Sequence, residues 1–256
     1  MEPHATAEQV WAASLIFARI GAVVMLIPGI GEAYVPPRIR LALALLVTLA
    51  LTPVIAPALP SLPASVGAMA GWVLRELITG LMIGALMRMM IAAMGIAGEI
   101  ASLQTALGFA QTANPMQAQP GTTLSAFLTL MAVTLVFATG THHLFIAGIA
   151  GSYEVITLSA PLMMGDFSTL AVRTLGQSFL LGVQLAAPLM VFSLIFNLAS
   201  GLIGRVMPSF QIYFAAAPLN VLLGLSVFAL SLGVIGMMFI DRYQSFLQTF
   251  TGGAGG

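Results

Sequence analysis

Four long stretches without a charged residue constrain this chain more than any other feature. They cover residues 41–74, 100–153, 174–204 and 206–240. Each is longer than the about 20 apolar residues that a helix needs to span a bilayer. Charged residues make up 6% of the sequence and hydrophobic residues 59%, whereas soluble domains carry about 25% charged residues. Because so little charge cannot coat a water-facing surface, we predict an integral membrane protein.

Helices are expected in place of a membrane β-barrel, because barrel strands alternate apolar and polar residues over about 10 positions and no such alternation is sustained here. The predicted fold is all-α and polytopic, in a single integral membrane domain over residues 1–256 with a disordered tail at 251–256. Length and the positions of Pro and Gly predict about six hydrophobic helices, at about residues 10–27, 39–59, 66–96, 124–149, 170–198 and 210–240.

Several classes of function are disfavoured by the composition. The eight basic residues are all Arg and the net charge is zero, so the electrostatic footprint of a nucleic-acid binder is missing. Cysteine is absent, which excludes thiolate chemistry and sulfur metal ligands. His142 and His143 are adjacent and point about 100° apart on a helix, unlike an i, i+4 ligand pair. With no catalytic motif found, we predict no enzyme, no cofactor and no metal.

Five charged residues lie in or beside the apolar segments, where a lone charge costs about 2.5 to 3.5 kcal/mol on insertion scales. Two interpretations are open: an ion or proton path, or interhelical salt bridges and Arg side chains that reach the membrane surface. The structural interpretation is favoured, because most of these residues lie toward segment ends. They are Arg19, Arg75, Glu76, Arg88 and Glu99.

A flank of the third predicted helix carries charges and glycines at four-residue intervals. It comprises Glu76, Gly80, Gly84 and Arg88, which share one side of a helix. Small residues at this spacing, as also at Gly67 and Gly71, let membrane helices approach closely. We predict that this flank is a packing surface that contacts a partner.

The segment at residues 98–123 is uncharged after Glu99 and rich in Gln, Thr, Ala and Gly, with breaks at Pro115 and Pro120. Irregular polar backbone next to membrane spans is tolerated where it is buried in protein or lines a water-filled cavity. A cavity lining or pore plug and an ordinary solvated loop both remain open from the residues alone.

Five strings, taken in order, resemble the FliR family of flagellar biosynthetic proteins, which is related to the T subunit of virulence type III secretion. They are FARIGAVVMLIPGIGEAYVPPRIR, RELITGLMIG, GEIASLQTALGFAQTANP, GTHHLFIAGIAGSYEVITLSAP and NLASGLIGRVMPSFQIYFAAAPLNVLLGL. The resemblance covers nearly the whole chain. Each string is loose by itself, whereas their order and spacing together are fairly specific.

The resemblance implies an export-gate subunit of the bacterial inner membrane, at the flagellar basal body. It implies helical hairpins, raised partly out of the bilayer, that assemble with FliP and FliQ into a conical channel for unfolded flagellar proteins. It also implies that a central loop at about residues 107–120 plugs the closed pore, although Asn114 stands where many relatives are expected to have Asp. The predicted plug residues are Gly108, Phe109, Gln111, Asn114, Pro115 and Met116. A secondary transporter and a virulence type III secretion homologue are the alternatives.

Overall fold

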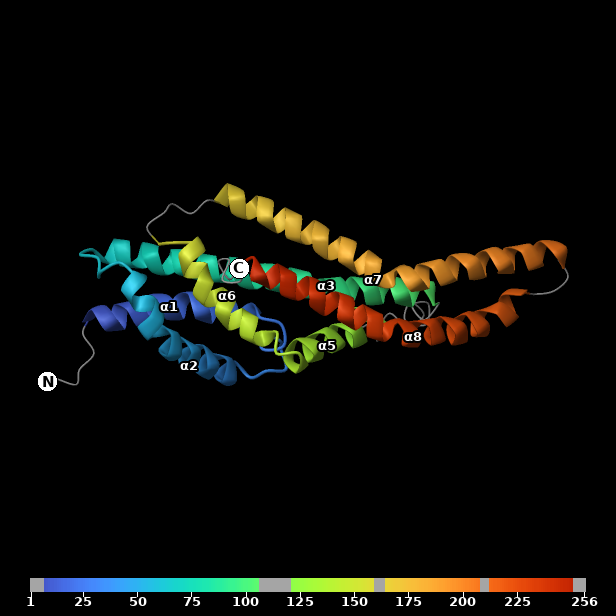
Figure 1. Ribbon diagram of the computed structural model, residues 1–256, viewed down its shortest axis with the longest axis horizontal. Helices are drawn as coiled ribbons and strands as arrows, with labels where there is room; N and C mark the ends of the chain where they lie inside the picture. Colours follow the sequence, from blue (N-terminus) through green and yellow to red (C-terminus); the bar gives the residue numbers. More distant parts are fainter. Residues whose placement is uncertain (1–6, 106–120, 159–163, 208–211, 251–256) are drawn as a thin grey trace. The chain divides into compact units, whose positions relative to one another are not determined.

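The computed structural model describes residues 7–105, 121–158, 164–207 and 212–250, and within these ranges all regular structure is helical (Figure 1). The first part contains α1 (Ala7–Leu26), α2 (Pro37–Ile55), the short 3-10 helix η1 (Ala56–Ala58) and α3 (Val66–Gln104). It is followed by α5 (Thr123–Ala138), α6 (His142–Val155), α7 (Met164–Val206) and α8 (Ile212–Gln248). The predicted all-α, polytopic fold class is confirmed.

Five of the described helices are long and apolar enough to cross a membrane, or up to six when the bent pair α5 and α6 is one span. The prediction of one helix over residues 124–149 is wrong in detail, because α5 ends at Ala138 and α6 begins at His142. Gly140 has a φ of 72°, a left-handed conformation that glycine adopts without the strain of a Cβ and that commonly ends a helix.

Several helices are longer than the sequence predicts. α3 continues to Gln104, α7 begins at Met164, and α7 and α8 contain 43 and 37 residues. At 1.5 Å per residue, α7 extends over about 65 Å, roughly twice the hydrocarbon core of a bilayer. Pro188 and Pro218 lie inside α7 and α8 without ending them.

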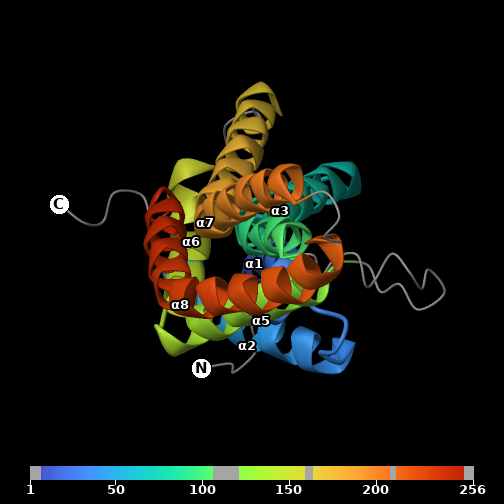
Figure 2. The same ribbon diagram turned by 90° about the vertical axis from the view of Figure 1, so that its right-hand side faces the viewer.

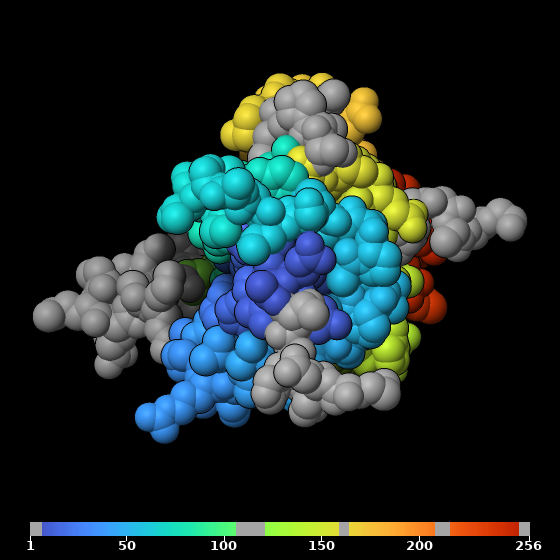
Figure 3. Space-filling view, turned by 90° about the vertical axis from the view of Figure 1, so that its left-hand side faces the viewer, coloured from blue at the N-terminus to red at the C-terminus, as the bar shows by residue number. Residues whose placement is uncertain are grey.

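The chain divides into two compact units. Unit 1 comprises Met1–Met90, Gly140–Thr174 and Gln244–Gly256. Its helix α1 packs on α2, and Figure 3 shows the end of α1, in dark blue, surrounded by α2 and the first turns of α3. The core of unit 1 contains Leu15 and Ile16 of α1 with Ile83 and Met87 of α3.

Unit 2 comprises Ile91–Thr139 and Leu175–Tyr243, so it holds α5 and the greater parts of α7 and α8 (Figure 2). α7 and α8 contact each other at Phe192 of α7 and Gly224 of α8. A Cβ added at Gly224 would lie 3.5 Å from Cε1 of the Phe192 ring. The rings of Phe127 and Phe228 pack edge to face, with centroids 6.1 Å apart. The single membrane domain predicted over residues 1–256 stays a prediction, and the tail at 251–256 lies outside the described residues.

Candidate functional site

The most deeply buried charges of unit 1 form an ion pair between two helices. Arg19 on α1 and Glu76 on α3 have side chains that are 1% and 0% exposed. Nε of Arg19 donates to Oε2 of Glu76 at 2.6 Å, and Nη2 donates to Oε1 at 2.8 Å. Two parallel bonds match the planar fork of a guanidinium to a carboxylate. The pair therefore brings together two charges that are each costly at membrane depth.

The other donors of Arg19 reach the C-terminal end of α6. Nη1 donates to the Ser152 hydroxyl at 3.1 Å, and Nη2 donates to the Ile156 carbonyl oxygen at 3.2 Å. Cζ lies 3.7 Å from the centroid of the Tyr153 ring, as in a cation–π interaction. The last carbonyls of a helix carry partial negative charge, and α6 has no basic residue in its own last turn. Arg19 supplies that cation from α1.

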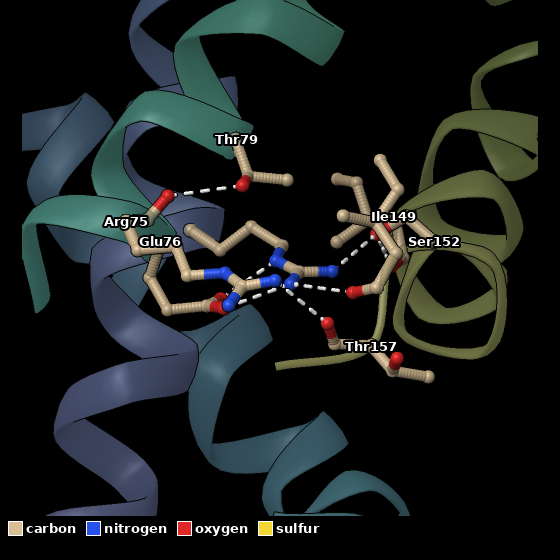
Figure 4. A network of polar contacts seen from close by, with 8 residues as sticks. Arg75, Glu76, Thr79, Ile149, Ser152 and Thr157 are labelled. Atoms are coloured by element: carbon tan, nitrogen blue, oxygen red, sulfur yellow. Dashed lines mark hydrogen bonds and ion pairs between the residues drawn. The ribbon is translucent and has the colours of Figure 1, made fainter. Parts of the chain in front are cut away.

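Arg75 extends this pattern beyond the end of α6. Its Nη1 donates to the Leu158 carbonyl oxygen at 2.7 Å, and its Nη2 donates to the Thr157 carbonyl oxygen at 2.9 Å. Figure 4 shows Arg75 and Glu76 of α3 in this network, with Thr157 opposite. Two guanidinium groups from different helices thus bind consecutive carbonyls at residues 156–158. We call the side chains of Arg19, Arg75, Glu76 and Ser152 the α6 clamp.

The chemistry of the α6 clamp suits helix attachment better than proton transfer. Arginine stays protonated in proteins, and both carboxylate oxygens of Glu76 accept hydrogen bonds from Arg19. Of the two interpretations left open by the sequence, the geometry at these residues is that of an interhelical salt bridge. The clamp joins α1, α3 and the end of α6 in unit 1.

The two glycines of the predicted flank lie against α1 of the same chain. A Cβ at Gly80 would overlap the carbonyl oxygen of Arg19 and lie 2.8 Å from Cβ of Ala22. A Cβ at Gly84 would lie 2.8 Å from Cβ of Leu26. Because Gly80 is one helical turn from Glu76, the close approach of α1 and α3 at this glycine sets the distance over which the ion pair forms.

Arg88 of the flank and the glycine pair Gly67 and Gly71 lack the close contacts of Gly80 and Gly84. Nη2 of Arg88 lies 3.5 Å from Oε2 of Glu32, with the two side chains 49% and 29% exposed, so this pair contributes little to stability. A Cβ at Gly67 or Gly71 would have no neighbour within 4 Å. Contact of the Glu76–Arg88 flank with another chain stays a prediction.

The predicted plug lies outside the described residues. It comprises Gly108, Phe109, Gln111, Asn114, Pro115 and Met116. The described residues on either side of this segment meet in unit 2. Oε1 of Glu99 on α3 accepts a hydrogen bond from the backbone N–H of Thr122 at 2.8 Å. The Thr122 hydroxyl accepts from the N–H of Ser125 at 3.3 Å and caps α5, as threonine does at helix starts.

Close packing reinforces this junction, which we call the loop neck (Gly98, Glu99, Thr122 and Ser125). A Cβ at Gly98 would lie 2.5 Å from the backbone nitrogen of Ser125, so only glycine lets α3 and α5 approach this closely. Gly121, with a φ of 95°, brings the chain into the neck. The described residues that flank the central segment, on α3 and at the start of α5, are therefore joined by a hydrogen bond to the Glu99 carboxylate.

Some members of these sites are absent from the residues predicted from the sequence. Ser152, Tyr153 and Thr122 are examples. Thr122 carries a local signal, because a threonine just before an apolar run is typical of a helix start. Ser152 carries none, since a serine in an apolar helix acquires a role only from the helix that faces it.

The two adjacent histidines lie at the start of α6. Their ring centroids are 4.2 Å apart, and Nδ1 of His143 lies 3.0 Å from the carbonyl oxygen of Gly140. Within the part of the chain that the structure describes, no group of three or more His, Cys, Asp or Glu is placed to hold a metal ion.

Sequence comparison adds to this geometry. Residues 10–246 match the family model of bacterial export proteins, family 1. The chain belongs to this family. It is 50% identical to the flagellar biosynthetic protein FliR of Caulobacter vibrioides over 98% of its own length and 100% of that protein. It is 31% identical to the FliR of Pectobacterium carotovorum over 86% of this chain and 83% of the relative.

The FliR of Escherichia coli is also 31% identical, over 82% of this chain and 80% of that protein. The resemblance to the FliR family is confirmed. Together with its apolar helices, this makes the chain a membrane protein of the flagellar export apparatus. The family is one of export-apparatus components and is not known for an enzymatic activity.

Proposed function

We propose that this member of the FliR family is an export-gate subunit in the bacterial inner membrane, at the flagellar basal body. It assembles with FliP-like and FliQ-like membrane subunits, and together they form the channel through which unfolded flagellar proteins leave the cytoplasm. Membership of the export family supports the general role, and the surface of α7 supports assembly with other chains.

The apolar surface of α7 is longer than a bilayer is thick. Leu175 and Val206 lie at opposite ends of its unit 2 portion and are 57% and 80% exposed. They are about 46 Å apart along the helix at 1.5 Å per residue, whereas the hydrocarbon core measures about 30 Å. Covering both with lipid would take a tilt of about 50°, more than the upper range of about 40°. Part of this surface therefore favours cover by protein.

We further propose that the central segment at about residues 107–120 closes the channel at rest. A gate for unfolded chains has to block small ions yet bind no particular peptide. Neutral side chains such as Gln111 and Met116 suit this task, because they make no strong charged contacts. The loop neck supports the proposal, since it joins the described residues that flank the segment on α3 and at the start of α5.

Co-purification tests the assembly. A tag on this chain, co-expressed with FliP-like and FliQ-like subunits, should bring both subunits through detergent extraction and size-exclusion chromatography. Isolation of the tagged chain alone or as a homo-oligomer would refute the hetero-oligomeric gate.

Ion conductance tests the plug separately. Deleting residues 111–119 should leave the assembly intact and make the membrane leak ions. A matched variant that replaces the same nine positions with Gly and Ser keeps the length of the segment and removes its side chains. If both variants leak ions, the side chains of the segment close the channel. If only the deletion leaks, the length of the segment is what closes it. Wild-type conductance in the intact deletion complex would overturn the plug.

A further inference from the structure

Among the described helices, α2 has an outward surface that differs from those of its neighbours. Only 17% of its membrane-span window is buried, compared with 50% for α1, which is of similar length. Its buried side chains are Ala44, Thr48 and Ile55, which form a narrow seam; α2 packs on α1. Leu46 and Leu49 lie on the opposite side of the helix. With the other exposed bulky apolar residues of α2, they form the set Leu41, Leu45, Leu46, Leu49 and Val54. We call this set the α2 stripe.

The length of α2 matches a bilayer, unlike that of α7. Its 19 residues extend over about 29 Å, close to the hydrocarbon thickness of about 30 Å. Leu46 and Leu49, near its middle, are 65% and 66% exposed. Lipid chains can therefore cover the whole α2 stripe without help from protein. Membrane helix–helix contacts favour small residues, whereas the stripe is built of leucine and valine.

One end of the α2 stripe carries cations that lack a carboxylate. Arg38 and Arg40 lie in the first turn of α2, where no acidic residue is present. Over the described ranges neither has a salt bridge; the nearest acidic side chain in sequence, Glu32, pairs with Arg88. The positive end of the helix dipole gives these guanidinium groups no stabilisation, so the described residues provide them with no countercharge and an external anion would stabilise them.

The same end carries Tyr34, which is 68% exposed in the turn before α2. Tyrosine and arginine are the residues that gather at the headgroup level of membranes, and arginine binds phosphate oxygens with its planar fork. Nη1 of Arg40 contacts Sδ of Met25 at 3.9 Å, which leaves its charge without a carboxylate. An apolar stripe of bilayer length that ends in tyrosine and in such arginines has the chemistry of a lipid-facing surface.

We infer that the α2 stripe is a phospholipid-contact surface of this chain, with the headgroup phosphates of one leaflet bound by Arg38 and Arg40. Acyl chains cover the stripe from Leu41 to Val54. This surface faces lipid in the assembled state as well, whereas the longer apolar surface of α7 needs protein.

Spin labelling tests the acyl-chain contact, and the absence of cysteine makes each introduced cysteine unique. Leu41→Cys, Leu46→Cys, Leu49→Cys and Val54→Cys would each be labelled with a nitroxide in the assembly that co-purifies with this chain. The assembly is placed in vesicles of phosphatidylethanolamine and phosphatidylglycerol. Collision with oxygen, relative to a water-soluble nickel chelate, should peak at Leu46 and Leu49 and fall toward both ends.

Two results would overturn the lipid contact. Immobilised labels with low collision rates for both reagents at Leu46 and Leu49 would show that another protein covers the stripe. High collision rates with the nickel chelate at the same positions would show that water covers it. Either result is independent of the export proposal, because co-purification of the FliP-like and FliQ-like subunits is measured separately.

Lipid retention tests the headgroup contact. Arg38→Gln should lower the amount of phosphatidylglycerol that stays bound through detergent purification. Arg88→Gln is the matched control, since it removes the same charge from a side chain that has its own carboxylate, Glu32, and it should retain lipid at the wild-type level. Equal retention in wild type and both variants would overturn the headgroup site.

Discussion

Removing only the carboxylate of the α6 clamp should destabilise unit 1 more than removing both charges. In Glu76→Met, Arg19 stays charged in a site where it is 1% exposed, and only the Ser152 hydroxyl, the Ile156 carbonyl and the Tyr153 ring remain around it. Breaking a buried ion pair by removing one partner costs about 3 to 5 kcal/mol. We expect that loss in the free energy of unfolding.

The double variant Arg19→Met/Glu76→Met has no unpaired charge. Apolar replacement of a buried ion pair is often neutral, so its main cost is the lost partner of the Ile156 carbonyl, about 1 to 3 kcal/mol for a buried polar group. Ser152 keeps its own hydrogen bond to the Ile149 carbonyl at 2.6 Å. The double variant should therefore be more stable than Glu76→Met by about 2 kcal/mol, the difference between these ranges.

Unfolding in mixed detergent and SDS micelles measures this difference. The chain has two tryptophans, Trp11 and Trp72, and both lie in unit 1, so their fluorescence reports on the relevant helices. Arg88→Gln is the control, because its exposed pair should contribute less than about 1 kcal/mol. If Glu76→Met is no less stable than the double variant, or only as destabilised as the control, the clamp does not carry the stability assigned to it.

Further predictions concern the glycines and the loop neck. Gly80→Ala should lower the thermal unfolding midpoint, because its Cβ overlaps α1 backbone, whereas Gly71→Ala on the same helix meets open space and should be neutral or stabilising by up to about 1 kcal/mol; equal midpoints would contradict the close approach. Replacing Gly80 and Gly84 together with Leu should reduce co-purification of the FliP-like and FliQ-like subunits before it reduces membrane insertion, and normal co-purification would refute this. Glu99→Ala should destabilise by about 1 to 3 kcal/mol, because the Thr122 amide loses its acceptor. Glu99→Gln keeps an acceptor oxygen and should recover most of that loss, so equal unfolding midpoints for the two variants would argue against the hydrogen bond.

The existence of most helices can be predicted from the sequence, because they carry long apolar runs. Their first and last residues are harder to predict. The third helix is predicted to end at about residue 96, yet residues 97–104 continue α3, and Gly98 there packs on α5. Tertiary packing outweighs weak helix propensity in such stretches. The break between α5 and α6 at Gly140 lies inside the charge-free run of residues 100–153. The apolar pattern of that run does not indicate where one helix ends and the next begins.

The pairing within the α6 clamp lies beyond a single sequence. Arg19 and Glu76 are 57 residues apart, and Arg19 and Ser152 are 133 apart. The insertion cost of a charge predicts that each has a partner, but it does not say which. The choice depends on how closely α1 approaches α3, and that distance follows from the glycine at position 80.

The positions of the charged residues distinguish surfaces that contact the same chain, lipid or other subunits. Arg19, Arg75 and Glu76 are bound to groups of the same chain, so these charges no longer indicate an ion path or a binding site for cargo. Arg38 and Arg40 lack a carboxylate in the described structure and border a stripe of bilayer length, which favours phosphate. The exposed surface of α7 is longer than a bilayer is thick, so lipid cannot cover its whole length. Assembly contacts are therefore expected along α7 and not along α2.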